Sequence, residues 1–195
     1  MLWIFWLVFA YFLGSIPFGL FIGKICYNLD IRTEGSKSTG ATNVARLCGF
    51  KYGVAALILD VAKGFVPVLM AYQYSHNWIF ISLVAAAAVL GHVFSIFLDM
   101  KGGKAVATTI GVFLALAPVA TIYSIIFLLA VIGLSGFVSM GSLTFAVALP
   151  FFTLVTGAIG MVPLACGMTM LLFWTHRDNI KRLAKGEENS WKKKK

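Results

Sequence analysis

The sequence predicts an all-helical integral membrane protein, and three observations lead to that prediction. Apolar residues make up 60% of the 195 residues, above the roughly 45–50% that is usual for a soluble domain. Only 12% of the residues are charged, and the mean hydropathy is +0.91. Several uncharged stretches are long enough to cross a bilayer as helices. This composition excludes soluble globular, disordered, collagen-like and coiled-coil chains.

Three predicted spans occupy the first half of the chain. Leu2–Gly23 has transmembrane length and no basic segment before it, so we predict a retained helix rather than a cleaved signal peptide. Tyr52–Tyr74 and Trp78–Leu98 are the next two candidates. Asp60 and Lys63 interrupt the earlier of these two. Because they are three residues apart they share a helix face, where we expect them to neutralise each other.

The second half holds two apolar stretches that are each too long for one span. Ala105–Leu134 is thirty uncharged residues, which extend about 45 Å as one helix and exceed a hydrocarbon core of about 30 Å. Pro118 marks the predicted break. Leu143–Trp174 is too long by the same argument, and the turn signal Gly157–Pro163 divides it. The sequence therefore predicts seven transmembrane helices.

Basic residues alternate between the predicted connections, and this sets the orientation of the chain. The turns after the second, fourth and sixth spans carry none. Apart from Lys63, the basic residues are Lys24, Arg32, Lys37, Arg46 and Lys51 after the first span, Lys101 and Lys104 after the third, and Arg177, Lys181, Arg182, Lys185 and Lys192–Lys195 in the tail. This pattern predicts an external N-terminus and a cytoplasmic C-terminus. The uncharged loop Ser135–Ser142 is predicted to be cytoplasmic as well. The net charge of +9 does not indicate nucleic-acid binding, because these residues form no stripe on a soluble face.

The first predicted cytoplasmic loop has the composition of an oxyanion-binding segment. Residues 32–46 hold five hydroxyl side chains, Asn43, two glycines and three cations. Hydroxyls and backbone N–H groups freed by glycine are short-range donors, and Arg46 can bind a phosphate through two hydrogen bonds. A plain polar linker is the alternative interpretation.

Lys101-Gly102-Gly103-Lys104 is a second candidate anion site. Unpaired backbone N–H groups and the positive end of a helix dipole at the start of the fourth span favour an anion there. The GxxxxGK[ST] spacing of a Walker A loop is absent. The alternative is a basic anchor with a glycine turn.

Two further pairs of polar residues fall on the predicted cytoplasmic side. His176 and Asn179 share a helix face directly below the last span. Ser139 and Ser142 also lie on one face of a helical turn, where they either bind a ligand or cap the sixth span. The convergence of these pairs with the two loops on one side of a small membrane domain favours a functional site.

Other polar features are predicted to be structural. His92 and Ser95 share a face and are expected to form hydrogen bonds between helices. The cysteines are odd in number and lack metal or disulfide spacing, so Cys26, Cys48 and Cys166 are interpreted as small apolar fillers. The lysine run Lys192–Lys195 is interpreted as a solvated tail near anionic lipid.

These motifs, in this order, resemble the acyl-phosphate-dependent glycerol-3-phosphate acyltransferases of bacteria, the PlsY family. The resemblance extends from the first span to Glu188. The matching blocks are Gly14-Ser15-Ile16-Pro17-Phe18-Gly19, Gly40-Ala41-Thr42-Asn43-Val44 with Arg46, Leu59-Asp60 with Lys63-Gly64, Gly91-His92 with Phe97, Lys101-Gly102-Gly103-Lys104, Ser139 with Ser142, and His176-Arg177 with Asn179-Ile180, Arg182-Leu183, Gly186 and Glu188.

The resemblance implies an enzyme of phospholipid synthesis. Such a protein moves a fatty acyl group from acyl phosphate to the sn-1 hydroxyl of glycerol 3-phosphate, releasing lysophosphatidic acid and phosphate. It implies one acyltransferase domain over residues 1–188, a basic tail over 189–195, and a multi-pass location in the bacterial plasma (inner) membrane. Its partners are the two substrates and membrane lipid, with no nucleic acid, metal or cofactor. The oligomeric state stays open.

The resemblance also implies roles for individual residues. The expected catalytic residues are Ser36, Arg46, Lys104, His176 and Asn179, and the expected substrate-binding residues are Thr42, Asn43, Gly102, Gly103 and Ser142. Arg46 and Lys104 are expected to bind phosphate, and His176 and Asn179 to orient the glycerol moiety. Whether His176 or the substrate's own phosphate takes the proton stays open.

The chain departs from the family's pattern in three places. Lys37-Ser38 replaces a usual Gly-Asn, and Lys37 is strained if that position needs a positive φ. Ala105 replaces a usual Gly, which matters little if the position is already helical. Asp99 adds a negative charge beside the lysine loop.

Two alternatives from other classes are a small transporter of a phosphorylated metabolite and a structural membrane subunit.

Overall fold

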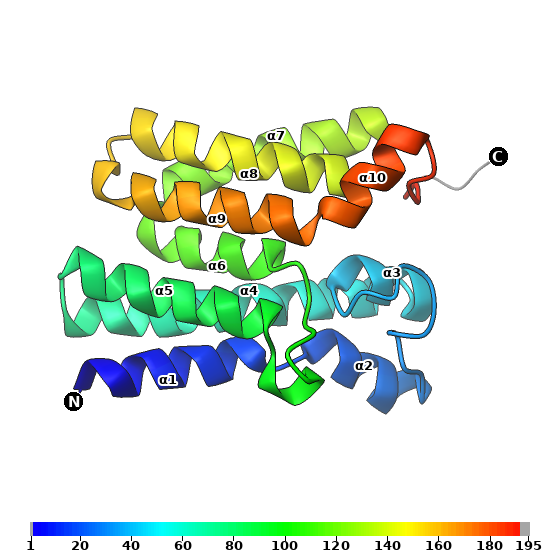
Figure 1. The fold of residues 1–195 in the computed structure, drawn as a ribbon, viewed down its shortest axis with the longest axis horizontal. Coiled ribbons are helices and arrows are strands. Elements are labelled where there is room, and N and C mark those ends of the chain that lie inside the picture. The colour runs from blue at the N-terminus through cyan, green and yellow to red at the C-terminus, as the bar shows by residue number, and fades with distance from the viewer. Residues whose placement is uncertain (1, 192–195) are drawn as a thin grey trace. The chain divides into compact units, whose positions relative to one another are not determined.

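The computed structural model describes residues 2–191, whose regular secondary structure is helical, with no strand among them (Figure 1). The all-helical membrane class is therefore confirmed. Five segments are long and apolar enough to cross a membrane, or six if the bent pair Ile159–Thr175 and Arg177–Lys185 counts as one. Val106–Leu116 is apolar but only 11 residues long. The chain divides after Leu116 into two compact units, and the predicted tail Lys192–Lys195 lies outside the described residues.

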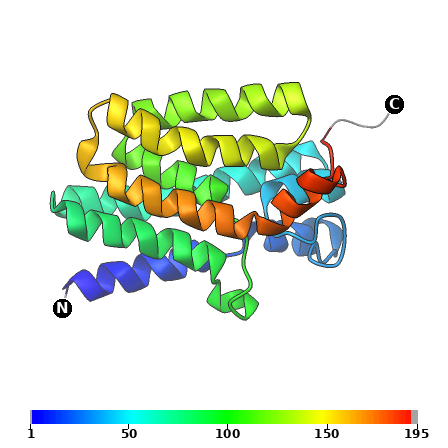
Figure 2. The same ribbon diagram turned by 45° about the horizontal axis from the view of Figure 1, so that its top comes forward.

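The first unit is built from six α-helices and one 3₁₀ turn within its described residues. These are α1 (Leu2–Ser15), α2 (Phe18–Tyr27), α3 (Ala41–Cys48), α4 (Phe50–Tyr74), α5 (Trp78–Val93), η1 (Ile96–Leu98) and α6 (Val106–Leu116). Helices α1, α4 and α5 pack side by side, and α6 packs on α4 (Figures 1 and 2). The α4–α6 contact requires glycine, because a Cβ on Gly111 would overlap the carbonyl oxygen of Val61.

The predicted first span, Leu2–Gly23, is interrupted. Helix α1 ends at Ser15 and α2 begins at Phe18, because Pro17 has no N–H to donate and disfavours helical geometry at Ile16. The single continuous helix expected from hydropathy is therefore wrong. Helix α2 continues to Tyr27, beyond the predicted end of the span.

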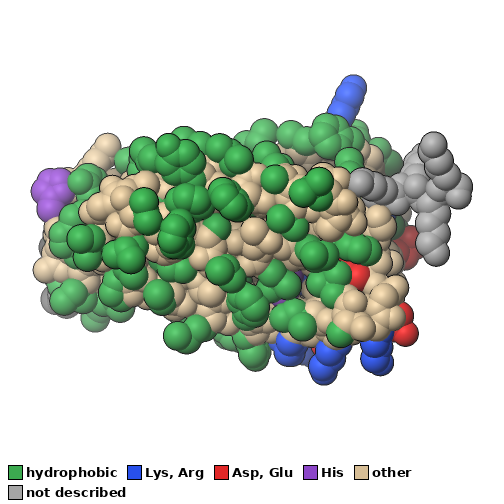
Figure 3. Space-filling view, turned by 90° about the horizontal axis from the view of Figure 1, so that it is seen from above, with side chains coloured by type: hydrophobic (Ala, Val, Ile, Leu, Met, Phe, Trp, Pro, Cys, Tyr) green, Lys and Arg blue, Asp and Glu red, His purple; other side chains and the backbone are tan. Residues whose placement is uncertain are grey.

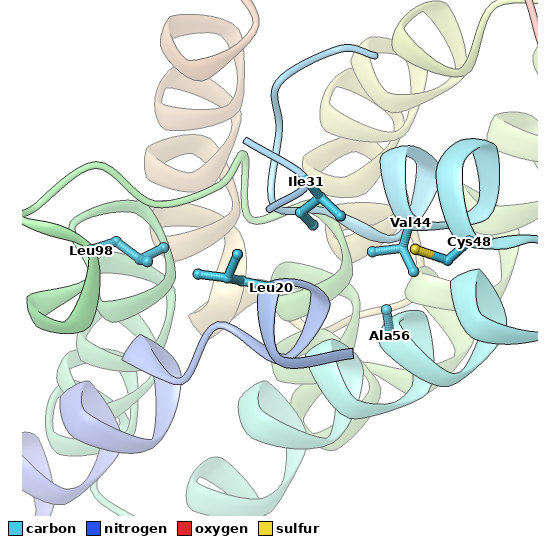
Figure 4. Packing of buried hydrophobic residues seen from close by; sticks show 6 residues of the cluster. All are labelled: Leu20, Ile31, Val44, Cys48, Ala56 and Leu98. Atoms are coloured by element: carbon cyan, nitrogen blue, oxygen red, sulfur yellow. The ribbon is translucent and has the colours of Figure 1, made fainter. Parts of the chain in front are cut away.

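Part of the predicted first loop, Ala41–Cys48, is helical and not a loop. Helix α3 carries an apolar face that belongs to a buried cluster shown in Figure 4, formed by Leu20, Ile31, Val44, Cys48, Ala56 and Leu98. Burial of Val44 and Cys48 gives this short helix its stability, because eight residues alone form a marginal helix in water. Cys48 is buried as predicted, but Cys26 is exposed and fills no core.

The second unit contains α7 (Pro118–Ser135), α8 (Val138–Val155), η2 (Ile159–Met161), α9 (Val162–Thr175) and α10 (Arg177–Lys185). The predicted breaks at Pro118 and near Gly157 are both confirmed, since α7 starts at Pro118 and Gly157 has a φ of +83°. The prediction that Ser135–Ser142 forms a loop is wrong. Gly136, with a φ of 78°, ends α7 in a left-handed conformation, and α8 begins two residues later.

Several buried polar residues of the first unit contact one another, although Thr109 Oγ1 is buried without a hydrogen-bond partner among the described residues. Lys63 Nζ lies 2.8 Å from Asp60 Oδ1, so the two charges pair as predicted. Ser95 Oγ donates to the Ser15 carbonyl at 2.6 Å, and His92 Nδ1 lies 3.0 Å from Thr108 Oγ1 of α6. The predicted interhelical roles of His92 and Ser95 are confirmed.

Hydrophobic side chains predominate on the face drawn in Figure 3. Large apolar residues are exposed in both units, among them Ile4, Ile25, Leu134 and Val155. A lipid environment accounts for this exposure, because apolar side chains are costly only in water.

Candidate functional site

In the first unit, the loop between α2 and α3 folds around the side chain of Asn43. Its Oδ1 accepts the Ser36 backbone N–H at 2.9 Å, and its Nδ2 donates to the carbonyls of Ile31 at 2.7 Å and Ser38 at 3.0 Å. Asn43 is 1% exposed. Both ends of its amide are thus engaged within the loop, and the consequence is a fixed backbone at Ser36.

Two residues with positive φ flank Ser36. Gly35 has a φ of 62° and Lys37 a φ of 55°. The left-handed conformation costs a non-glycine residue about 1 kcal/mol, so Lys37 carries the strain expected for a lysine at a glycine position. The loop holds this geometry because Asn43 bonds the residues on both sides of Lys37.

Arg46 lies on α3, one turn after the half-buried Thr42, and its side chain is exposed. Arg32, in the loop before α3, is already engaged, since its Nη2 lies 2.6 Å from Asp30 Oδ2. Hydrogen bonds from Arg32 lower the pKa of the Asp30 carboxyl to about 2. Arg46 is therefore the better placed of these two guanidinium groups to meet an anionic ligand.

The Lys101–Lys104 loop is held by backbone hydrogen bonds to the end of α5. The N–H groups of Gly102 and Gly103 donate to the carbonyls of Val93 at 2.9 Å and His92 at 3.0 Å. Both glycine N–H groups are therefore engaged by α5. The predicted anion site, which depends on N–H groups at the start of α6, stays a prediction. A Cβ on Gly103 would overlap His92 Nε2, so glycine is needed here for close packing.

The loop ends in a strained residue. Ala105 has a φ of 61° and is 1% exposed, immediately before α6 begins. The position is not helical, so replacement of the family's usual glycine by alanine is costly here rather than mild. Asp99 and Met100 also have positive φ, at 49° and 62°.

In the second unit, three polar residues donate hydrogen bonds to the carboxylate of Glu188. Its Oε1 accepts from Ser139 Oγ at 2.8 Å and from Asn179 Nδ2 at 2.6 Å, and its Oε2 accepts from Arg182 Nε at 2.7 Å. Burial raises the pKa of Glu188, but the hydrogen bonds from Asn179, Ser139 and Arg182 outweigh it, so the pKa lies below its usual value of 4.5. The Asn179 amide is thereby oriented by an ionised carboxylate.

His176 occupies the junction of α9 and α10, where the helix axis bends by 57°. Its side chain is 3% exposed, and its Nδ1 lies 2.8 Å from the Leu172 carbonyl oxygen. A carbonyl oxygen only accepts, so Nδ1 carries the proton. In the neutral ring the lone pair is then on Nε2, the nitrogen suited to accept a proton.

Ser142 lies on α8, one turn after the start of the helix, and is 5% exposed. Its Oγ donates to the Val138 carbonyl of the same helix at 3.0 Å. Ser139, predicted to share its face, instead reaches Glu188. Their placement on a helix, and not in a loop, fixes the direction of both hydroxyls.

The structure thus forms two groups from the predicted site residues. Ser36 and Asn43 meet in one loop of the first unit, and Gly102 and Gly103 pack on His92. In the second unit, Asn179 and Ser139 both bond to Glu188. Among the described residues there is no cluster of three or more His, Cys, Asp or Glu that could hold a metal ion. The role of Glu188 was missed, although Gly186, with a φ of 71°, is the signal that turns the chain back after α10.

Comparisons with known proteins agree on one family for this chain. The family model described as glycerol-3-phosphate acyltransferase matches residues 4–186. A protein of Maridesulfovibrio salexigens named glycerol-3-phosphate acyltransferase is 93% identical over 195 residues, covering 100% of both chains.

Two solved structures are also similar to this chain. Both are crystal structures of PlsY, an integral membrane glycerol 3-phosphate acyltransferase, one in a glycerol 3-phosphate form and one in a lysophosphatidic acid form. Each is 37% identical, and their TM-scores are 0.94 and 0.91. The alignments cover 98% and 97% of this chain and 96% and 95% of the others.

Proposed function

Because this chain belongs to the glycerol-3-phosphate acyltransferase family, we propose that it moves a fatty acyl group from acyl phosphate to the sn-1 hydroxyl of glycerol 3-phosphate. The glycerol oxygen forms a bond to the acyl carbon, the bond from that carbon to the phosphate oxygen breaks, and the hydroxyl proton is released. The products are lysophosphatidic acid and inorganic phosphate. The observation that carries this proposal is the likeness, over almost the whole chain, to a relative crystallised with this substrate and this product.

Arg46 and Lys104 are the residues proposed to hold the substrate phosphates. The guanidinium of Arg46 is exposed at the end of α3, and a guanidinium binds phosphate through two parallel hydrogen bonds. Lys104 adds a point charge from a loop whose backbone is held at Gly102 and Gly103. The two glycines, whose N–H groups bond to α5, are proposed to shape the phosphate site beside Lys104.

His176 and Asn179 are proposed to orient the glycerol moiety. The hydroxyl proton passes either to the substrate's own phosphate or to His176 Nε2, the ring nitrogen left to accept it because Nδ1 donates to Leu172. Asn179 donates from Nδ2 to Glu188, which directs its Oδ1 acceptor away from that carboxylate. Acyl phosphate is a mixed anhydride with a good leaving group, so positioning contributes more of the rate than a strong base.

The other predicted residues shape the site. Asn43 fixes the backbone at Ser36, whose hydroxyl we place among the catalytic donors, and Thr42 is proposed to bind substrate. Ser142, a buried hydroxyl of the second unit, is proposed to bind substrate. No step of the reaction requires a metal or cofactor.

We also propose seven membrane crossings with an external N-terminus, in one domain over residues 1–188 followed by the basic tail 189–195. Helix α6, with 11 residues, extends about 16 Å and is shorter than the hydrocarbon core. Its flanking residues Ala105 and Ala117 are 1% and 5% exposed, and non-helical backbone is tolerated at membrane depth where protein buries it. The distribution of basic residues supports this orientation, and the bacterial relative supports a plasma-membrane location.

Purified protein in lipid tests the reaction directly. Supplied with palmitoyl phosphate and glycerol 3-phosphate, it is expected to release lysophosphatidic acid and inorganic phosphate in equal amounts. Sealed vesicles that hold the protein and labelled glycerol 3-phosphate, without acyl phosphate, test the transporter alternative. Loss of label from these vesicles without any acyl product would contradict the proposal.

A further inference from the structure

A charged pair lies at the centre of the first unit, apart from the residues assigned to the reaction. Asp60 and Lys63 are 2% and 3% exposed, and Lys63 Nζ also donates to the Ile16 carbonyl at 2.7 Å. That carbonyl belongs to the break between α1 and α2. Desolvation makes a buried ion pair a costly way to fill a core, and apolar residues of similar size often serve as well or better. Its presence therefore requires a reason other than stability.

His92 connects this pair to the Lys101–Lys104 loop. Its Nδ1 lies 3.0 Å from Thr108 Oγ1 and 3.9 Å from Asp60 Oδ1. The opposite edge of the ring faces the loop, since a Cβ on Gly103 would overlap Nε2. The cavity beside Asp60, Lys63 and His92 is only about 10 Å³, which is room for about one water molecule. The ring is thus closely packed on this side as well as against Gly103.

The backbone of Lys104 is anchored to His92 on both sides. Before it, the Gly103 N–H donates to the His92 carbonyl at 3.0 Å. After it, Thr108 in the first turns of α6 contacts the His92 ring. A change in the position of His92 must therefore be transmitted to Lys104.

We propose that Asp60, Lys63 and His92 are positioning residues that hold the diglycine and so present Lys104 to the substrate phosphate. Lys63 ties the pair to the α1–α2 break, Asp60 faces the His92 ring, and His92 supports the loop. This proposal rests on the proposed function, because it takes Lys104 to bind phosphate. None of the three residues touches substrate in this scheme.

The first test measures the loop without using activity. Trypsin cleaves after Lys101 and Lys104 once the loop leaves its hydrogen bonds to α5. In protein purified in detergent, His92→Leu is expected to speed cleavage at these two sites about tenfold or more, since cleavage follows the population of the open loop. His92→Asn retains an amide near the position of Nδ1 and is expected to give an intermediate rate. Unchanged cleavage in both variants would overturn the proposal.

The second test asks whether His92 acts through Lys104. His92→Leu is expected to raise the KM for glycerol 3-phosphate about tenfold, the scale of one charge-assisted hydrogen bond, with a smaller change in kcat. In a Lys104→Ala background the same change is expected to have almost no further effect, because the residue it positions is gone. Equal effects in both backgrounds would overturn the proposal.

Ser124→Ala is the matched control, because Ser124 is buried but donates only within its own helix, to Ala120 at 2.8 Å. It is expected to leave trypsin cleavage and KM unchanged. If the wild-type protein forms no lysophosphatidic acid, the proposed reaction fails, while the cleavage rates still decide whether His92 holds the loop. The two failures are thus distinguishable.

Discussion

Among single residues, His176 shows how one hydrogen bond selects the tautomer of a side chain that we propose to be catalytic. Donation from Nδ1 to Leu172 leaves Nε2 as the acceptor. Asn179, one turn later, is oriented by Glu188 in a similar way. Both side chains are held before any substrate arrives, which lowers the entropy cost of reaching a reactive geometry.

His176→Ala and Asn179→Ala are expected to reduce kcat/KM by about 10²–10⁴-fold, the usual range for loss of an acid–base or orienting group. Steady-state release of phosphate in lipid measures this. Lys181→Ala, an exposed change on the same helix α10, is the control and is expected to retain near-normal turnover. Normal turnover in both test variants would remove this helix junction from the site.

The left-handed conformation of Ala105 should lower the stability of the protein. Ala105→Gly is expected to stabilise the protein by about 0.5–1 kcal/mol, because relief of the left-handed strain exceeds the extra entropy of glycine in the unfolded chain. Thermal unfolding in detergent measures the change. Ala62→Gly, in the regular interior of α4, is expected to destabilise by about 1 kcal/mol. The same sign for both variants would contradict the strain at Ala105.

At the scale of elements, close helix approach depends on particular glycines. A Cβ on Gly111 would overlap the backbone of Val61 in α4, whereas one on Gly133 in α7 would meet open space. Gly111→Ala is therefore expected to cost about 1–3 kcal/mol by overpacking. Gly133→Ala is expected to be neutral or to stabilise by up to about 1 kcal/mol. Unfolding midpoints of the two variants decide this, and equal losses would argue against direct α4–α6 contact.

The segment after α10 is attached to α8 by Glu188, and this attachment depends on pH. The folded-state pKa of Glu188 lies below its usual 4.5, so its contribution to stability is present above that value and is lost as pH falls through the folded pKa. We expect the unfolding temperature of wild type to fall more steeply below about pH 4.5 than that of Glu188→Gln. Glu187→Gln, an exposed neighbour, should follow wild type. Parallel curves for wild type and Glu188→Gln would contradict the predicted ion pairing.

At the scale of the whole molecule, orientation in the membrane follows from where the basic residues lie. With single cysteines introduced in a cysteine-free background, positions 51 and 101 are expected to react with an impermeant thiol reagent from the cytoplasmic side, and position 75 from the outside. Inside-out and right-side-out vesicles provide the comparison. Labelling of position 75 from the cytoplasm would contradict the seven-crossing topology.

Hydropathy and proline placement predicted most of the helices, because span length and backbone chemistry are local properties. The break at Pro118 and the turn at Gly157 were found in this way, and the Asp60–Lys63 pair followed from helix periodicity. The break at Pro17 and helix α3 were missed. Helix α3 is short and depends on burial of Val44 and Cys48, and no local pattern reports what a side chain will pack against.

Composition and motif order were enough to predict the membrane class and the family, and they identified the residues proposed to bind phosphate. The partners of the buried polar side chains came from the three-dimensional structure. It showed that the N–H groups of Gly102 and Gly103 bond to α5, and that Ser139 and Asn179 meet at Glu188. Hydrogen-bond partners far apart in the chain are selected by packing of whole helices, because a buried polar group must find a partner wherever the fold provides one. Residue spacing carries no record of that choice.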